Sequence, residues 1–144
     1  MNLCVGAVDR RDDDIVVRFG SNELVLPPAS LSAYPKVTEY VGRKVAVGMR
    51  SESFFRPEAT VSERYRFRAE VNLIEVLGAE ALIHLTTDAS PVITDEVADA
   101  FEDADAFEEY REHHRGGFTM VARADPRNLP ERHQMIDVPR RLRR

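Results

Sequence analysis

Residues 65–85 constrain the fold of this chain more than any other part of its sequence. Apolar and polar residues alternate at the start of this segment, and the apolar set on one side is Tyr65, Phe67, Ala69, Val71 and Leu73. Gly78 interrupts the alternation, and residues 81–86 resume it. The pattern predicts a strand-turn-strand unit with one face in the core and the other in water.

Shorter β segments flank this unit. We predict strands at residues 3–8, 15–19, 23–26, 44–49, 118–123 and 135–138, with a solvated hairpin loop at residues 9–14. Residues 27–40 begin with Pro27-Pro28 and are expected to cross the surface, and residues 51–64 are expected to form a loop. Many short strands interrupted by one helix favour a small barrel or a sandwich over an α/β fold.

The helix is predicted at residues 91–115, where the hydrophobic period changes from two to between three and four. Its apolar face contains Val97, Phe101 and Phe107, which we expect to cover an edge or the core of the barrel. Gly116-Gly117 ends the helix, and His113 and His114 are expected to form a pair of cations at its C-terminus.

Composition limits the classes of function. The chain has 144 residues, 43% of them hydrophobic and 31% charged, which is typical of one globular domain. Its single cysteine, Cys4, cannot form an internal disulfide and is expected to be a small buried hydrophobe, so a reducing cytoplasm is the default compartment. The net charge of -5 opposes binding to nucleic acid. No run approaches the length of about 18 apolar residues that spans a membrane.

Motifs for catalysis and metal binding are missing from the sequence. Gly42-Arg43-Lys44 has neither the preceding glycine nor the following hydroxyl of a phosphate-binding loop, so we expect no ATP hydrolysis. The four histidines lack the spacing of a zinc site, and His84 is expected to be structural. We therefore predict no enzyme activity, no cofactor and no metal.

Two short motifs then occur in the order found in a known domain family. The first is Gly48-Met49-Arg50-Ser51-Glu52, and the second, inside residues 69–85, is Glu75-Val76-Leu77-Gly78-Ala79-Glu80. On these motifs, and on the later segment 121–126, the chain resembles the C-terminal OB-like (TOBE) domain of sugar-type ABC-transporter ATPases. Ser51 stands where that family usually has proline, and residues 139–144 depart from the family's usual ending.

The resemblance implies a fold and a set of motif residues. The fold is mainly β, an OB-fold-like small barrel with one inserted amphipathic helix, as a single domain over residues 1–144. The implied structural motif residues are Gly48, Arg50 and Glu52 at one turn, and Gly78 and Glu80 at another.

The resemblance also implies a function through interaction. The chain would be a detached regulatory domain of an ABC sugar importer, without the ATPase domain, whose partners are ABC ATPase or permease subunits. Two copies could pair as a homodimer. The location would be cytoplasmic, with contact to the inner face of the cell membrane only through a transporter complex. Because Met1-Asn2-Leu3 resembles the end of the segment leading from the ATPase domain, we expect the DNA upstream to encode that domain.

Two alternatives to this role stay open. One is a stand-alone OB-like module that binds a small anion or metabolite. The other is a gene remnant whose product has no function.

Overall fold

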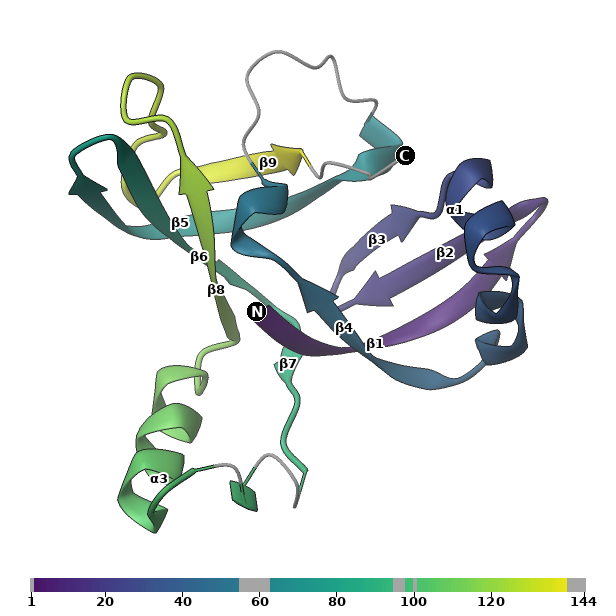
Figure 1. The fold of residues 1–144 in the computed structure, drawn as a ribbon, viewed down its shortest axis with the longest axis horizontal. Helices are drawn as coiled ribbons and strands as arrows, with labels where there is room; N and C mark the ends of the chain where they lie inside the picture. Colours follow the sequence, from purple (N-terminus) through teal and green to yellow (C-terminus); the bar gives the residue numbers. More distant parts are fainter. Residues whose placement is uncertain (1, 55–62, 95–97, 100, 140–144) are drawn as a thin grey trace.

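The predicted mainly β fold class is confirmed: the chain forms a small OB-like barrel with a helical insertion (Figure 1). The computed structural model describes residues 2–54, 63–94, 98–99 and 101–139. Its strands are β1 (Asn2–Arg11), β2 (Asp14–Phe19), β3 (Asn22–Val25), β4 (Lys44–Met49), β5 (Arg66–Leu77), β6 (Glu80–Thr87), β7 (Ser90–Pro91), β8 (Phe118–Ala124) and β9 (Met135–Pro139).

These strands build two curled antiparallel sheets. The first has the order β3-β2-β1-β4, and the short β7 adds to β1; the second has the order β8-β6-β5-β9. All the strands expected from the sequence are present. The first hairpin loop is shorter than predicted, because β1 continues to Arg11 and β2 begins at Asp14, so that Asp12, with a φ of 53°, makes the turn.

Short helical turns occur in the described parts of the predicted surface crossing and of the predicted loop. Residues 27–40 contain the helix α1 (Pro28–Ala33) and the 3-10 helix η1 (Pro35–Tyr40), each with proline in its first turn, where the missing N–H costs nothing. The predicted loop 51–64 contains the 3-10 helix η2 (Ser51–Ser53) and the start of η3 (Glu63–Tyr65), while residues 55–62 lie outside the described part of the chain.

The core lies between the buried faces of the two sheets. At its centre the ring of Phe67 in β5 meets Phe19 of β2 and Phe54, each with a centroid separation of 5.6 Å and near-perpendicular planes. Cys4 is fully buried in β1 beside Val47 of β4, as the sequence predicted, and burial raises the pKa of its thiol to about 11.

Two asparagine side chains join the sheets where backbone pairing stops. The Asn2 amide donates to the carbonyl of Val121 in β8 at 3.0 Å, and its oxygen accepts the Val121 N–H at 2.9 Å. Asn22 makes the same pair of bonds with the backbone of Arg68 in β5, at 3.1 and 2.8 Å. Each amide therefore substitutes for a peptide unit and satisfies backbone groups of the opposite sheet.

A β-bulge changes which side chains of β5 face the core. Val71 pairs with Leu85 and Leu73 pairs with His84, which leaves Asn72 as an extra residue. The alternation is reset at this point, so Leu73 is 42% exposed, while Ile74 packs against the core. The prediction that Leu73 belongs to the core is therefore wrong.

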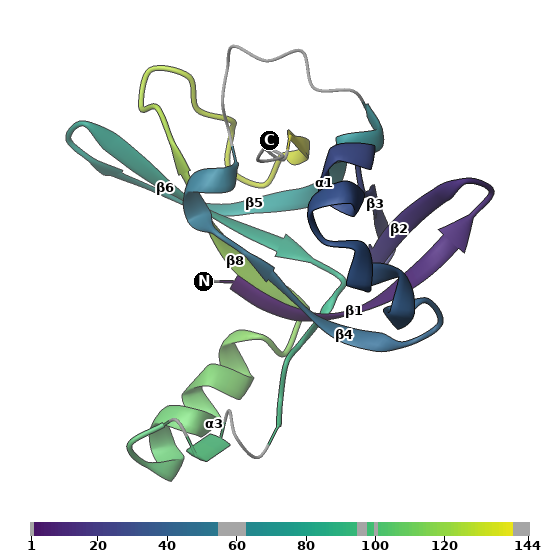
Figure 2. The same cartoon turned by 45° about the vertical axis from the view of Figure 1, so that its right-hand side comes forward.

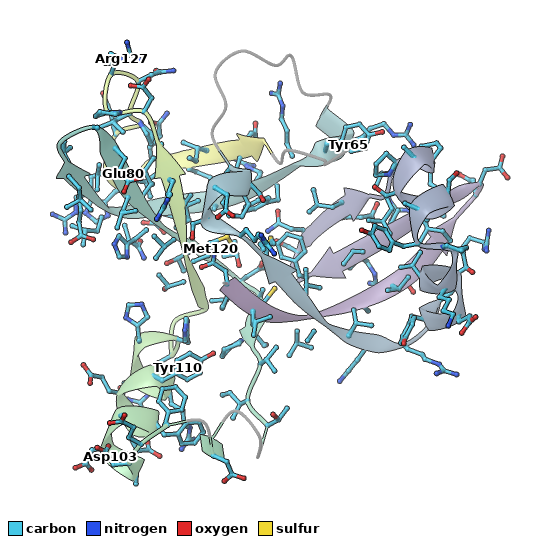
Figure 3. The ribbon with its side chains drawn as sticks, viewed as in Figure 1. Tyr65, Glu80, Asp103, Tyr110, Met120 and Arg127 are labelled. Carbon is cyan, nitrogen blue, oxygen red and sulfur yellow. The ribbon has the colours of Figure 1, made fainter. Side chains whose placement is uncertain are left out.

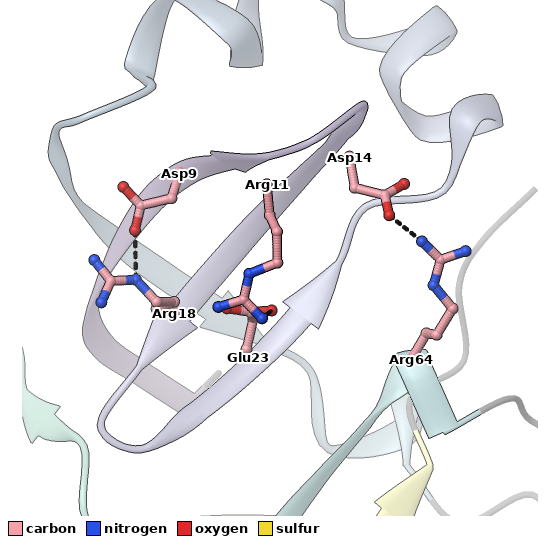
Figure 4. Close-up of polar contacts among 6 residues, drawn as sticks. All are labelled: Asp9, Arg11, Asp14, Arg18, Glu23 and Arg64. Carbon is pink, nitrogen blue, oxygen red and sulfur yellow. Dashed lines mark hydrogen bonds and ion pairs between the residues drawn. The ribbon is translucent and has the colours of Figure 1, made fainter.

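The first sheet carries ion pairs on its surface, two between its strands and one with η3 (Figure 4). Arg11 reaches Glu23 at 2.9 Å, Arg18 contacts Asp9, and Arg64 contacts Asp14. All six side chains are accessible to solvent, so each pair contributes about 0–1 kcal/mol.

The inserted helix does not cover the barrel. The helix α3 spans Ala104–His113, begins after the N-cap Asp103 and has no buried residue. Aromatic side chains of the insertion pack on one another instead: the ring centroid of Phe101, which precedes α3, lies 5.5 Å from that of Phe107 and 5.2 Å from that of Tyr110. Figures 1 and 2 both show α3 projecting away from the sheets. The expected contact of Phe101 and Phe107 with the barrel is wrong, and Val97 lies outside the described residues.

The start of the insertion also differs from the prediction. Ser90 and Pro91 form β7 and pair with β1, so no helix begins there. The amphipathic period of residues 93–110 arises because the aromatic side chains contact one another within the insertion, and sequence periodicity cannot distinguish that packing from contact with the barrel.

Candidate functional site

The first motif turn joins the two sheets. Gly48 lies in β4 opposite Leu3 of β1, and the chain then turns through η2, which packs against β8. Arg50 and Glu52 follow on the surface, where Arg50 Nη1 lies 3.9 Å from Glu52 Oε1 and more than half of each side chain is exposed. The two side chains are free to contact another molecule.

The second motif forms the tip of the β5–β6 hairpin. Gly78 and Ala79 are the two central residues between the paired Leu77 and Glu80, and Gly78 has a φ of +74°, which a glycine adopts without strain. Glu80 Oε2 lies 3.7 Å from Arg123 Nε of β8. Figure 3 shows Glu80 at the end of the barrel that also carries Arg127, far from Tyr110 and Asp103 of the insertion.

The motif residues do not converge on one reaction centre. Glu52 pairs with Arg50, while Glu80 pairs with Arg123, and the hydrogen bonds and ion pairs of the described residues include none between the two turns. The structure thus gives the motifs a role in shaping turns.

Two depressions on the described surface were not indicated by the sequence. An apolar groove of about 530 Å³ lies between the 27–41 crossing and the first sheet, and its lining includes Leu26, Val37, Tyr40 and Val45. A polar cleft of about 410 Å³ lies near the Asn22–Arg68 junction, with Glu70, Thr86 and Asp88 in its lining. The N–H of Ser21 donates to both oxygens of Asp88, at 2.9 and 3.0 Å, and lowers the pKa of that carboxyl.

The histidines have structural partners. His84 Nε2 lies 2.6 Å from Glu75 Oε2 across the β5–β6 hairpin, and His133 Nδ1 lies 3.7 Å from Glu70 Oε1. His114 is buried, and burial together with the neighbouring His113 lowers its pKa, so the expected pair of cations at the end of α3 is wrong. Among the described residues, no group of three or more His, Cys, Asp and Glu side chains could hold a metal ion.

One edge of β5 is open beyond the end of β9. The strand β9 pairs with β5 from Arg66 to Glu70, and Val71 then exchanges hydrogen bonds with His133 and Gln134, at 2.6 and 2.9 Å. The last contact on this side is from Arg132 Nε to the carbonyl of Asn72, at 2.9 Å. Past it, residues 73–77 have no backbone hydrogen bond on this side from any described residue, and we call them the edge segment.

The side chains of the edge segment are accessible and largely apolar. Leu73, Val76 and Leu77 are 42%, 58% and 55% exposed. Glu75 is the single charged residue among them, and nearly half of its side chain is exposed. Sequence reasoning placed one face of this strand, including Leu73, in the core and the other face in water. It missed the open edge because the length of β9 and the position of the bulge are set by tertiary pairing.

No protein-family model and no curated protein matches this chain. No helix of the described residues has the length and apolar character to cross a membrane.

Proposed function

We propose that this chain is a non-catalytic interaction module, the detached regulatory domain of a sugar-type ABC importer ATPase. The single observation that supports this proposal most is the position of the two motifs. In an OB-like barrel, Gly48, Arg50 and Glu52 shape the turn that packs on β8, and Gly78 and Glu80 shape the tip of the β5–β6 hairpin. The exposed charges of the first turn and the exposed apolar side chains near the second offer contact surface for a partner subunit.

A reconstituted importer tests this proposal. The purified chain would be titrated into an assembled complex of permease and ATPase subunits from the same organism while ATP hydrolysis is measured. We expect a saturable change in the hydrolysis rate, which the double variant Arg50→Ala, Glu52→Ala weakens. No change at any concentration, together with no co-sedimentation with the complex, would exclude the transporter role.

The proposal also predicts that the chain alone does not turn over ATP. A binding measurement with magnesium-ATP supplies the control, because the sequence has no loop to cradle phosphates. Saturable ATP binding at micromolar concentration would contradict the non-catalytic assignment.

The alternative function is a stand-alone module that binds a small anion or metabolite. The apolar groove and the polar cleft favour it, because each has a volume in the range of small-molecule sites. A bound ligand raises the melting temperature by mass action, so a thermal-shift screen with sugars, phosphate esters and oxyanions separates this alternative from a pure protein-binding role.

A further inference from the structure

We propose that the edge segment, residues 73–77, binds an extended segment of another protein as an additional β-strand, and that this partner strand places a basic residue between apolar ones. The inference rests on the proposed interaction role. It requires a protein partner, but that partner need not belong to a transporter.

The backbone geometry provides the first argument. Leu77 and Glu80 flank the two-residue turn at the hairpin tip, so they form the hydrogen-bonded pair that closes it. Hydrogen-bonded and non-hydrogen-bonded pairs alternate along an antiparallel ladder, which directs the N–H and C=O groups of Glu75 toward β6. Those of Ile74 and Val76 consequently point to the open side, where an incoming strand can pair with them.

The side chains provide the second argument. Leu73 and Leu77 lie on the outer face of the hairpin on either side of Glu75, and their exposed apolar surface would be covered by apolar residues of a partner strand. Opposite Glu75, a partner residue occupies a non-hydrogen-bonded position, where side chains of antiparallel strands are closest. A lysine or arginine there forms a favourable pair with the carboxylate.

Charge favours a foreign basic strand over the symmetric pairing of two copies about Glu75. A second copy that pairs its own edge segment symmetrically about Glu75 would place two Glu75 carboxylates directly opposite each other, and like charges at such positions destabilise a sheet. His84 already contacts one oxygen of Glu75, at 2.6 Å, but each copy would bring its own carboxylate to the axis. A foreign basic strand avoids this repulsion.

Synthetic peptides test the proposal directly. The probe is a labelled peptide with the order threonine, leucine, valine, lysine, valine, leucine, threonine; a second peptide has glutamate in place of lysine, and a third has both valine nitrogens methylated. These two nitrogens carry the N–H groups that would donate hydrogen bonds to the backbone carbonyls of Ile74 and Val76. We expect saturable binding of the lysine peptide and a loss of affinity of roughly tenfold or more on methylation, since two hydrogen bonds are removed.

Protein variants locate the binding to the edge. Glu75→Lys should reverse the preference, so that the glutamate peptide binds more tightly than the lysine peptide. Val76→Pro removes an outward N–H and should weaken binding of the lysine peptide, whereas Val76→Thr, which keeps that N–H, should not. The methylated peptide supplies the same test on the unchanged protein if Val76→Pro does not fold.

Three results would overturn the inference. The first is no saturable binding of the lysine peptide at millimolar concentration. The second is equal affinity for the methylated peptide, which would show that side chains alone hold it. The third is a dimer in sedimentation that the peptide does not dissociate, which would assign the edge to a second copy. A failed importer assay would leave the peptide result standing, so the two proposals fail separately.

Discussion

The imidazole of His114 lies nearly parallel to the ring of Phe118, with their centroids 5.3 Å apart. Its Nδ1 also accepts the N–H of Thr119 at 3.1 Å, which only an unprotonated Nδ1 can do. This stack connects the inserted helix to β8, because the ring of Tyr110 in α3 packs on the imidazole of His114, with a centroid distance of 4.7 Å. The attachment of the insertion therefore depends on a neutral imidazole.

We predict that His114 makes the stability of the protein depend on pH. Burial, and then the charge of His113, lower the pKa of His114 in the folded protein below its ordinary value of 6.5. As the pH falls through 6.5, the unfolded chain takes up the proton first, so the free energy of unfolding decreases until the pH passes the lowered folded-state pKa. Urea unfolding at a series of pH values measures this slope.

The matched variants separate His114 from its neighbour. His114→Asn retains an acceptor for the Thr119 N–H but does not titrate, so its unfolding free energy should lose this part of the pH dependence. His113→Asn should raise the folded-state pKa of His114, because one cause of the lowered pKa is removed, so stability should fall over a narrower pH range below 6.5 and by a smaller total amount. An unchanged slope in His114→Asn would assign the dependence to other groups.

Asn22 should contribute more to stability than an exposed asparagine. Asn22→Ala leaves both the N–H and the C=O of Arg68 without the partner that the buried Asn22 amide supplies, and we expect a loss of about 2–4 kcal/mol. Asn128→Ala, in the exposed turn after β8, should change stability by less than about 0.5 kcal/mol. Chemical denaturation gives both values, and equal losses would show that the junction does not depend on the side-chain amide.

Aromatic truncations should differ between the core and the insertion. Phe67→Ala removes a ring that contacts both Phe19 and Phe54 and should cost about 3–5 kcal/mol. Phe101→Ala disrupts only the packing of the insertion and should leave the unfolding midpoint of the barrel close to that of the unchanged protein. A large shift of the barrel midpoint in Phe101→Ala would mean that the insertion does pack on the sheets in solution.

Two glycines with positive φ should tolerate alanine differently. At Gly20, with a φ of +56°, a Cβ would lie 2.6 Å from the backbone nitrogen of Ala89 and would also overlap Asp88, so we expect Gly20→Ala to cost about 3 kcal/mol or more. At Gly78, with a φ of +74°, an added Cβ would have no atom within 4 Å apart from the adjoining residues. Gly78→Ala should therefore cost only the conformational strain of about 1–2 kcal/mol. Thermal unfolding distinguishes the two outcomes.

Sequence reasoning predicted the strands well, because alternation and turn residues are local signals. Phe67, Ala69 and Val71 are buried as the pattern indicated, and the turn at Gly78 lies where the alternation breaks. The core position of Cys4 also followed from its apolar neighbours.

The failures arose where long-range contacts decide the outcome. The bulge at Asn72 moves Leu73 to the surface, and nothing between residues 65 and 73 indicates it. The periodicity of α3 correctly indicated a helix with an apolar side, but it could not show that Phe101, Phe107 and Tyr110 contact one another instead of the barrel. Likewise, the junction roles of Asn2 and Asn22 depend on residues 119 and 46 positions away in the chain.

The burial of Cys4 turns the only thiol of the chain into an internal reporter. A thiol with a pKa of about 11 and no exposed surface presents almost no thiolate to an alkylating reagent, so labelling requires the barrel to open between β1 and β4. The labelling rate therefore reports how often the barrel opens. Its dependence on urea concentration distinguishes a local separation of β1 from β4 from complete unfolding. The opening of the barrel can thus be followed at Cys4 in the unchanged sequence, without introducing or removing a cysteine.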